Sequence, residues 1–348
     1  MPLPWIRPAV ATLHPYVPGE QPQDRRYIKL NTNESPYPPS PRVLAAIREA
    51  AHDDLRLYPD PQANALRDRA AAVYGCERDA ILVGNGSDEL LNLVIRTCVD
   101  SADAVVYPFP TYSLYDTLVT IQGGRPVHVP YPADFRLPEG LAEAGGRITF
   151  VCNPNSPSGT GIPLSVVRDL AARVRGLLVV DEAYVDFADE TALPLASDRP
   201  NVVVLRTFSK SFSLAGMRIG LAFGAPALMT ELAKVKDSYN VNRLSIVAAT
   251  AALEDYAWMQ QNVARVRATR TRLSAGLAEL GYGVLPSQAN FVLARRSGTD
   301  QEATYAALKT HGILVRFFPA PGLRDALRIT VGTDDQTDAL LAALRRVV

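Results

Sequence analysis

A lysine, an aspartate and an arginine in this chain stand where they could act on one small molecule. Lys210 lies among hydroxyl residues in the segment 207–218, and Arg218 ends that segment. Asp181 directly follows the apolar run 176–180. A lysine amine can form a Schiff base with an aldehyde, a carboxylate keeps a pyridine nitrogen protonated, and an arginine binds a phosphate. Pyridoxal phosphate needs these three groups from a protein, so the sequence predicts an enzyme that uses this cofactor.

Each of these residues also has a simpler interpretation when it is considered alone. A single lysine is usually a solvated surface residue, and an aspartate after a strand often caps a turn. The placement favours the functional interpretation, because Asp181 stands at the carboxyl end of a predicted strand, where open α/β sheets bind ligands. Lys210 likewise follows an apolar run, 202–205. We therefore expect Asp181 to face the ring nitrogen and Lys210 to carry the cofactor.

A glycine turn earlier in the chain is a candidate phosphate site. Gly86 permits a turn between a predicted strand and a helix, and Ser87 and Asp88 stand at the helix N-terminus. Free backbone N–H groups attract an anion there. Ser209 and Arg218 would complete the site, since arginine offers a forked pair of donors. Such turns are common, so the prediction depends on the other residues being close by.

Two further segments could contact the cofactor ring. Tyr112 follows the next predicted strand and could stack on the ring, or it could be a core aromatic residue. Residues 153–159 contain two prolines and a glycine, which stiffen the backbone. An asparagine held there could donate to the phenolic oxygen of the cofactor, or the segment could be a simple turn.

The composition limits the class of protein. The 348 residues are 47% apolar, and Lys+Arg 36 balances Asp+Glu 36, so neither nucleic acid nor an anionic membrane is expected as a partner. No apolar run approaches the roughly 18 residues of a membrane span, and residues 1–10 lack a signal-peptide pattern. Three cysteines without CxxC spacing predict a reducing, cytoplasmic location. Four scattered histidines argue against a metal site.

Apolar strands alternate with amphipathic helices over most of the chain. Predicted strands cover residues 80–83, 104–107, 148–152, 177–180, 202–205 and 219–223. Predicted helices cover residues 41–54, 62–74, 88–98, 112–122 and 164–174. Continuous apolar strands predict an α/β fold with a mostly parallel sheet between two layers of helices. This sheet would bring the ends that carry the candidate residues to one edge.

The pattern changes after residue 225. Long helices are predicted over 226–239 and 245–280, and short strands over 290–294, 313–315 and 327–331. We expect an N-terminal arm over residues 1–40, a large cofactor-binding domain over 41–265 and a smaller α+β domain over 266–348. The arm is expected to pack with the small domain.

Taken together, these segments resemble the fold-type I, pyridoxal-phosphate-dependent aminotransferases, and most closely the histidinol-phosphate aminotransferase family. The resemblance runs nearly from end to end. It is carried by residues 13–19, 29–37, 58–60, 153–159, 181–184, 207–218, 239–242 and 327–333, together with the Gly86 turn. The segments around Lys210 and Asp181 identify the superfamily, and the arm and the last segment identify the family.

Position by position, the resemblance implies a set of cofactor contacts. Lys210 would bind the cofactor as a Schiff base and then move a proton, Asp181 would pair with the ring nitrogen, and Tyr112 would stack on the ring. Tyr184 and Asn155 would contact the phenolic oxygen. The phosphate and its surroundings would be held by Ser87, Asp88, Thr207, Ser209 and Arg218.

The resemblance also implies contacts with the substrate and with a second subunit. Arg328 matches an arginine that binds a substrate carboxylate. Arg316 matches a residue that holds a substrate phosphate, with Tyr16 and Asn33 nearby. Tyr58 would reach the cofactor phosphate of the partner subunit, so a homodimer is implied.

One position departs from the pattern of the family. Many members carry two consecutive asparagines in the loop 153–159, and the second asparagine touches the cofactor. In this chain Ser156 stands at that position. Either Asn155 takes over the contact or Ser156 makes it with a weaker hydrogen bond.

The resemblance implies a ping-pong reaction of histidine biosynthesis. It would interconvert L-histidinol phosphate and 2-oxoglutarate with imidazole-acetol phosphate and L-glutamate. An aminotransferase for phenylalanine or tyrosine and a threonine-phosphate decarboxylase remain alternatives, because both share the cofactor site. A cofactor-sensing transcription regulator would need an added DNA-binding domain, and the proline-rich residues 1–40 do not suit one.

Overall fold

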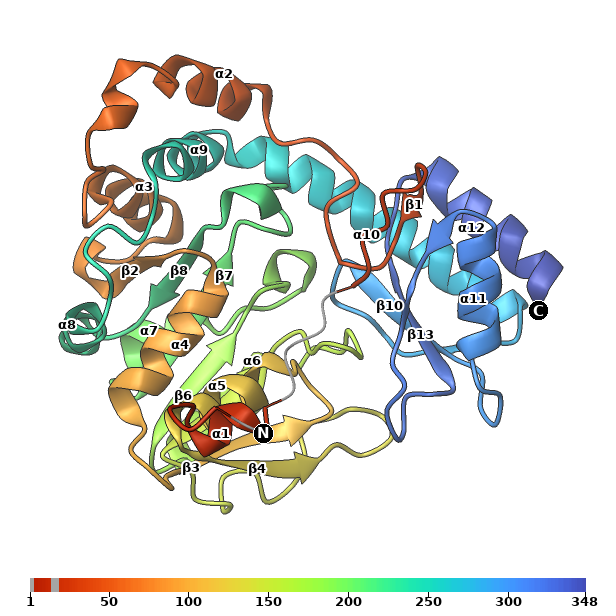
Figure 1. The fold of residues 1–348 in the computed structure, drawn as a ribbon, viewed down its shortest axis with the longest axis horizontal. Helices are drawn as coiled ribbons and strands as arrows, with labels where there is room; N and C mark the ends of the chain where they lie inside the picture. Colours follow the sequence, from red (N-terminus) through yellow and green to blue (C-terminus); the bar gives the residue numbers. More distant parts are fainter. Residues whose placement is uncertain (1–2, 14–18) are drawn as a thin grey trace.

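The computed structural model describes residues 3–13 and 19–348. A seven-stranded sheet forms the larger part of the molecule, and a four-stranded sheet forms the C-terminal part. The long helix α10 (Tyr256–Glu279) runs from one part to the other (Figure 1). The α/β fold with a large, mostly parallel sheet and a smaller C-terminal α+β part, expected from the sequence, is confirmed, and the boundary within α10 stays a prediction.

The large sheet contains β2 (Ile81–Gly84), β3 (Ala104–Phe109), β4 (Arg125–Pro130), β5 (Ile148–Cys152), β6 (Leu177–Asp181), β7 (Val202–Thr207) and β8 (Gly220–Phe223). Their order is β2-β8-β7-β6-β5-β3-β4. β8 is antiparallel to both of its neighbours, and the other pairs are parallel. The parallel strands therefore end at one edge, where β6 and β7 present Asp181 and the segment that follows Thr207.

Helices cover both faces of this sheet (Figure 1). The helices of this part of the molecule are α2 (Pro41–Ala50), α3 (Asn64–Tyr74), α4 (Ser87–Cys98), α5 (Leu114–Gln122), α6 (Leu164–Arg173), α7 (Leu193–Asp198), α8 (Pro226–Lys234) and α9 (Arg243–Glu254), of which α2 packs on α9. Short 3-10 helices lie at η1 (Asp53–Arg56), η2 (Arg78–Ala80), η3 (Val185–Phe187) and η4 (Ala215–Met217). Ser40 caps α2 by accepting a hydrogen bond from the Arg42 amide at 3.1 Å, and Pro41 suits the first helical position.

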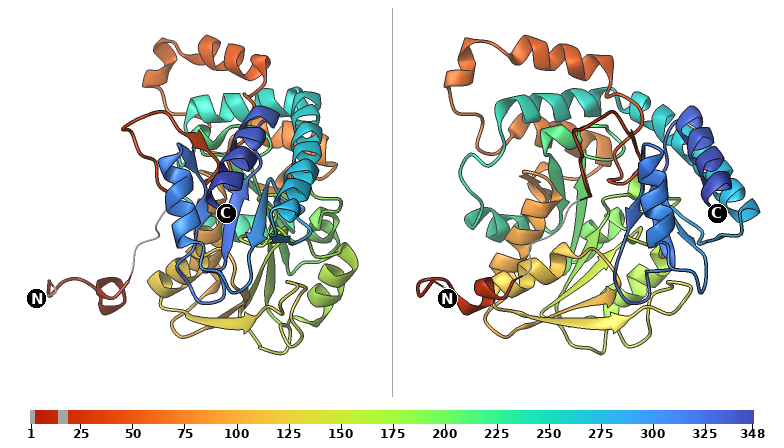
Figure 2. Two further views of the ribbon diagram at one scale, coloured as in Figure 1. Left: turned by 90° about the vertical axis from the view of Figure 1, so that its right-hand side faces the viewer. Right: turned by 45° about the vertical axis from the view of Figure 1, so that its right-hand side comes forward.

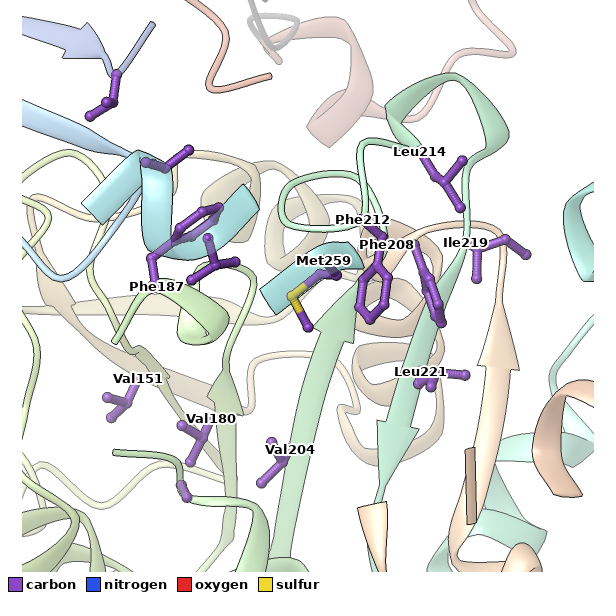
Figure 3. Close-up of a cluster of buried hydrophobic side chains, with 14 of the residues drawn as sticks. Val151, Val180, Phe187, Val204, Phe208, Phe212, Leu214, Ile219, Leu221 and Met259 are labelled. Atoms are coloured by element: carbon purple, nitrogen blue, oxygen red, sulfur yellow. The ribbon is translucent and has the colours of Figure 1, made fainter. Parts of the chain in front are cut away.

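Alternate residues of the central strands belong to two different hydrophobic clusters. Val180 and Val204 pack on one side of the sheet, with Phe208 and Phe212 in the same cluster (Figure 3). Val203, one residue before Val204, packs on the other side. Strand side chains alternate between faces, so a sheet covered on both sides needs uninterrupted apolar strands. Each buried valine contributes about 1.5–3 kcal/mol, and this burial fixes the strand ends that carry the polar residues.

The C-terminal sheet contains β9 (Gly283–Val284), β10 (Phe291–Arg295), β12 (Arg316–Phe317) and β13 (Ala326–Thr330), all antiparallel, in the order β12-β13-β10-β9. α11 (Glu302–Thr310) and α12 (Asp334–Val347) lie beside it (Figure 1). The arm strand β1 (Ile28–Lys29) pairs in parallel with β11 (Ile313–Leu314). The arm therefore meets the C-terminal part of the chain.

The beginning of the arm lies elsewhere. α1 (Pro8–Ala11) contacts α5, at the side of the large part (Figure 2). Trp5, just before α1, leaves 76% of its surface exposed. The described residues of the arm thus contact both parts of the molecule.

Several element predictions were wrong or incomplete, and no bounds were predicted for α1, α11, α12, β1, β9 and β12. The helix expected over 245–280 is two helices, because the backbone breaks at Asp255, whose carboxylate accepts a hydrogen bond from Ser40. The helix expected to reach residue 239 ends at Lys234. α7 was not predicted. β4 was also missed, because its two prolines argue against a strand, although an edge strand tolerates them.

Candidate active site

One cavity of about 260 Å³ brings together most of the predicted site residues. It lies where the strand ends of the large sheet face β12 and β13. The predicted residues that line it are Asn33, Ser87, Asp88, Tyr112, Asp181, Tyr184, Thr207, Ser209, Lys210, Arg218, Arg316 and Arg328. Tyr58 and Asn155 are not among its lining residues. Tyr16 lies outside the described residues.

Asp181 is a buried carboxylate at the end of β6. It accepts hydrogen bonds from the Tyr115 hydroxyl at 2.8 Å and from the Ala183 amide at 3.2 Å. Burial raises its pKa from 3.8 to about 6. Both of these donors are neutral, so a protonated ring nitrogen in the cavity would supply the positive charge that offsets the burial of this carboxylate.

Lys210 lies in the loop after β7, with its amine inside the cavity. Nζ donates to the Thr32 carbonyl oxygen at 3.4 Å and lies 5.7 Å from the centre of the Tyr184 ring. Burial, and next the positive charge of Arg328, lower its pKa from 10.5 to about 8. A lysine with such a pKa has a substantial neutral fraction near neutral pH and is suited to attack an aldehyde.

The turn before α4 is shaped to bind an anion. Arg218 donates to the Ser209 hydroxyl and to the Asp88 carboxylate, both at 3.2 Å, and Thr207 donates to Ser209 at 3.0 Å. A Cβ atom on Gly86 would lie only 2.7 Å from a terminal nitrogen of Arg218. Gly86 also has a φ of +84°, which other residues rarely adopt. The glycine therefore allows the guanidinium to approach the helix N-terminus.

Two tyrosines border the space between Asp181 and this turn. The Tyr112 hydroxyl donates to the Asp88 carboxylate at 3.1 Å, and its ring meets Tyr115 edge to face. The Tyr184 hydroxyl accepts a hydrogen bond from the Asn33 side chain at 3.1 Å, and burial raises the pKa of Tyr184 to about 12. Tyr184 therefore stays protonated and can donate a hydrogen bond into the cavity.

The loop 153–159 turns Ser156, not Asn155, toward the cavity. The Asn155 side chain accepts a hydrogen bond from Thr111 at 2.7 Å and donates to Ser158 at 2.9 Å, so it is used within the protein. Ser156 lines the cavity, and its hydroxyl accepts a hydrogen bond from Arg328 at 3.1 Å. Of the two residues left open by the sequence, the structure places Ser156 in the cavity.

Two arginines converge on the cavity from the C-terminal sheet. Arg316 and Arg328 lie opposite each other in the β12–β13 pair. Their guanidinium groups lie 5.3 Å and 5.4 Å from the centre of the same ring, that of Phe318. Arg328 also donates to the Asn31 carbonyl oxygen at 3.1 Å. The pair provides two forked cation sites for the anionic groups of a substrate.

Sequence reasoning missed Tyr115 and Glu34. Tyr115 follows Tyr112 at helical spacing, and this spacing is the signal that could have linked it to the same site. Glu34 lines the cavity and accepts hydrogen bonds from Lys29 and Thr32, both at 2.7 Å. Glu34 lies within the segment 29–37, and this position is the signal that could have linked it to the site.

These donors suit pyridoxal 5'-phosphate. Asp181 offers a buried anion for a ring nitrogen, Lys210 offers an amine of lowered pKa, and the Gly86 turn leaves space that a Cβ would fill beside Arg218. Within residues 3–13 and 19–348, no group of three or more His, Cys, Asp or Glu side chains could hold a metal ion. The same part of the chain contains no helix that is both long and apolar enough to cross a membrane.

Comparisons with known proteins agree with this site. The aminotransferase class I and II family description matches residues 25–344. Histidinol-phosphate aminotransferase 1 of Nostoc sp. is 48% identical over 343 residues, covering 98% of this chain and 97% of the relative. The corresponding enzyme of Citrifermentans bemidjiense is 46% identical over 98% of both chains. A crystal structure of histidinol-phosphate aminotransferase from Sinorhizobium meliloti, in complex with pyridoxal-5'-phosphate, superposes with a TM-score of 0.92 at 33% identity over 99% of this chain and 98% of that one.

Proposed function

Because this chain belongs to the class I and II aminotransferases, and among them to the histidinol-phosphate aminotransferases, we propose that it transfers the amino group of L-histidinol phosphate to 2-oxoglutarate. The products are imidazole-acetol phosphate and L-glutamate, and the reaction runs in either direction. The enzyme uses pyridoxal 5'-phosphate and serves histidine biosynthesis.

One observation carries the proposal: a single cavity holds Lys210 and Asp181 together with the arginine pair of β12 and β13. The first two residues suit the cofactor. The arginine pair suits a substrate that carries an anionic group away from its amine.

The bound cofactor supplies an electron sink for the carbon from which a proton is removed. The protein supplies the rest. Asp181 keeps the ring nitrogen protonated by its charge, and the Tyr115 hydroxyl fixes the orientation of that carboxylate. The Lys210 amine removes a proton from the substrate carbon and returns one, since a pKa of about 8 lets it do both near neutral pH.

The substrate groups are held by the arm and the C-terminal sheet. Arg316 binds the phosphate of histidinol phosphate, and Arg328 binds the carboxylate of glutamate. Asn33 donates to Tyr184 and accepts from Thr330 at 3.1 Å each, so it links the arm to both sides of the cavity. Asn33 thereby holds the Tyr184 hydroxyl, which would donate to the phenolic oxygen of the bound cofactor, and Ser156 accepts a hydrogen bond from Arg328 at 3.1 Å.

The proposal includes a homodimer in which Tyr58 contacts the cofactor phosphate of the other subunit. Tyr58 leaves 77% of its surface exposed and stacks on Tyr239, with ring centroids 4.3 Å apart. Leu55 and Leu57 beside it are also exposed. An exposed tyrosine next to exposed leucines is suited to a protein interface. We place the enzyme in the cytoplasm.

The test is to mix the cofactor-loaded protein with L-histidinol phosphate and to follow the absorbance of the cofactor band. We expect rapid loss of that band, which 2-oxoglutarate restores. L-Phenylalanine and L-threonine phosphate serve as controls. A faster reaction with phenylalanine would assign the enzyme to aromatic amino acids, and CO₂ release from threonine phosphate would make it a decarboxylase.

Lys210→Ala should abolish turnover, and full activity in that variant would contradict the proposal.

A further inference from the structure

The loop that carries Lys210 is anchored at both sides by aromatic residues. Phe208 and Phe212 are buried with ring centroids 4.7 Å apart, and both point into the hydrophobic cluster below the sheet edge (Figure 3). Between them and η4 the backbone is strained, because Ser213 has a φ of +61°. A loop in this conformation needs further contacts to hold Lys210 in one place.

Ser211, the residue after Lys210, provides such a contact. Its hydroxyl donates a hydrogen bond to the carboxylate of Asp186 in η3. Asp186 lies 3.6 Å from a guanidinium nitrogen of Arg206, which is almost completely buried. The pair of Asp186 and Arg206 therefore contacts the loop through Ser211.

The same charged pair reaches the segment that carries Asp181. Arg206 donates to the carboxylate of Glu182, the next residue after Asp181, at 3.2 Å. Thr191 donates to Glu182 at 2.8 Å and accepts from Arg206 at 2.9 Å. This cluster of Glu182, Asp186 and Arg206 thus includes the residue after Asp181 and contacts the residue after Lys210.

The charges of the cluster do not balance. It contains two carboxylates and one guanidinium, and the Glu182 carboxylate already forms a close pair with Arg206 while lying fully buried. Burial raises the pKa of Glu182, which indicates that a negative charge is costly at this place. Asp186 is therefore the surplus carboxylate. Glu182 and Arg206 alone would balance in charge, but they would leave Ser211 without the carboxylate acceptor that Asp186 provides.

We propose that Asp186 is a positioning residue, which fixes the Lys210 loop through Ser211 so that the lysine amine points into the cavity. A charged acceptor forms a stronger hydrogen bond than a neutral one, and this strength holds the strained loop. The proposal rests on the proposed function, because it takes Lys210 as the reacting amine. It predicts that Asp186 contributes more to the reaction than to stability.

A double-mutant cycle tests this proposal. Asp186→Ala, Ser211→Ala and the double variant should each lower kcat by about tenfold to a hundredfold with little change in KM, since misplacing a reacting group slows the reaction more than binding. The double variant should be no slower than the slower single variant, because both remove one hydrogen bond. Asp186→Asn keeps a neutral acceptor and should lie between wild type and Asp186→Ala.

The matched control is Asp189→Asn. A second cavity, separate from the one that holds Lys210, is lined by both Asp186 and Asp189. Asp189 forms its ion pair with the half-exposed Arg267. This variant should keep the kcat of wild type. Thermal unfolding of the cofactor-free proteins should show a similar Tm for Asp186→Asn and wild type, because the substitution leaves one carboxylate paired with one guanidinium.

A second readout needs no substrate. The cofactor-free variants are mixed with pyridoxal 5'-phosphate, and the rate at which the Lys210 adduct appears is followed by absorbance. We expect Asp186→Ala and Ser211→Ala to form it about tenfold more slowly than wild type. Additive effects in the cycle, or unchanged kcat with a lowered Tm, would overturn the proposal. Normal adduct formation in wild type without turnover of histidinol phosphate would contradict the proposed function alone.

Discussion

At the scale of single residues, burial sets the protonation of Lys210 and so the pH at which the amine reacts. A pKa of about 8 means that about a tenth of the amine is neutral at pH 7, against far less than a hundredth for an exposed lysine. We expect the rate of pyridoxal phosphate addition to the cofactor-free protein to rise from pH 6 and to level off above about pH 8. Stopped-flow absorbance over pH 6 to 10 measures this profile. A rate that still rises steeply at pH 10 would show an ordinary lysine.

At Asp181, the ionised form that the reaction needs lowers the stability of the cofactor-free protein. Its pKa is raised in the folded protein, so the folded state binds more protons than the unfolded state between pH 3.8 and about 6. The stability from this group is therefore present below pH 3.8 and is lost as the pH rises through 6. Asp181→Asn should stabilise the cofactor-free protein at pH 8 by roughly 3 kcal/mol, since one pKa unit corresponds to about 1.4 kcal/mol, while weakening activity severely.

Urea unfolding of both cofactor-free proteins at pH 5 and pH 8 tests this expectation. The gain from Asp181→Asn should be larger at pH 8 than at pH 5. Equal stability of the two proteins at pH 8 would mean that burial of the ionised Asp181 carboxylate does not destabilise the folded protein.

The two arginines of the C-terminal sheet should differ in the substrate that they serve. Arg316→Ala should raise the KM for histidinol phosphate by at least about tenfold, since a desolvated charged hydrogen bond contributes about 1.5–3 kcal/mol. Glutamate should be affected much less. Single-turnover measurements with each substrate separate the two half-reactions. Equal losses for both substrates would contradict the phosphate role of Arg316. Arg328→Ala is the matched comparison, and it should slow the half-reaction of glutamate more than that of histidinol phosphate.

At the scale of elements, the turn between β2 and α4 is the most constrained part of the cofactor site. Gly86→Ala places a methyl group against the Arg218 guanidinium in a backbone conformation of positive φ. We expect a rise of about tenfold or more in the dissociation constant of pyridoxal 5'-phosphate, because Arg218 must move. Equilibrium titration of the cofactor-free variant measures this.

Gly75→Ala is the control for this turn. Gly75 also has a positive φ, +69°, but a Cβ there would meet no atom within 4 Å. Gly75→Ala should therefore lower stability by about 1 kcal/mol and leave cofactor affinity unchanged. If both variants bound the cofactor equally well, the contact with Arg218 would not matter.

The strands and helices of the large sheet were predictable because their apolar periodicity follows directly from burial. Elements decided by distant contacts were not predictable. At the break between α9 and α10, Asp255 accepts a hydrogen bond from Ser40, which is distant in sequence and meets it only in the folded chain. β4 depends on its place at the sheet edge, where Pro126 and Pro130 are tolerated. Periodicity within one segment contains no information about either contact.

The candidate site was predictable to a similar degree. Residues that stand at strand ends, such as Asp181 and Lys210, could be assigned because the sheet brings those ends together. The choice between Asn155 and Ser156 could not be made from the sequence, because it depends on which side chain the loop turns inward. The link between Asp186 and Ser211 joins η3 to the Lys210 loop, and no spacing rule predicts it.

At the scale of the whole molecule, the proposed dimer makes each site depend on two chains. Tyr58→Ala should weaken cofactor binding, because the contact that it removes lies in the partner's site. Mixing refolded Tyr58→Ala subunits with Lys210→Ala subunits tests this arrangement. A mixed dimer contains one site with both defects and one site with neither, so at limiting cofactor the mixture should be more active than the two variants measured separately.

Recovery of activity in the mixture, together with sedimentation at the mass of a dimer, would support the shared site. Additive, independent activities of the two preparations would place Tyr58 in its own subunit's site or outside any site. Tyr239, on which Tyr58 stacks, offers a milder variant: Tyr239→Ala should loosen the Tyr58 ring and give a smaller effect of the same kind.

The lowered pKa of Lys210 has a consequence for the protein before it is loaded. A neutral amine in an accessible cavity reacts with any small aldehyde, and cells contain reactive sugars and metabolic aldehydes. The newly made enzyme is therefore open to glycation at the one amine that it cannot lose. Pyridoxal 5'-phosphate, once bound, acts as a protecting group for this lysine as well as the reagent of catalysis, and the long storage life of such an enzyme should depend on keeping it loaded.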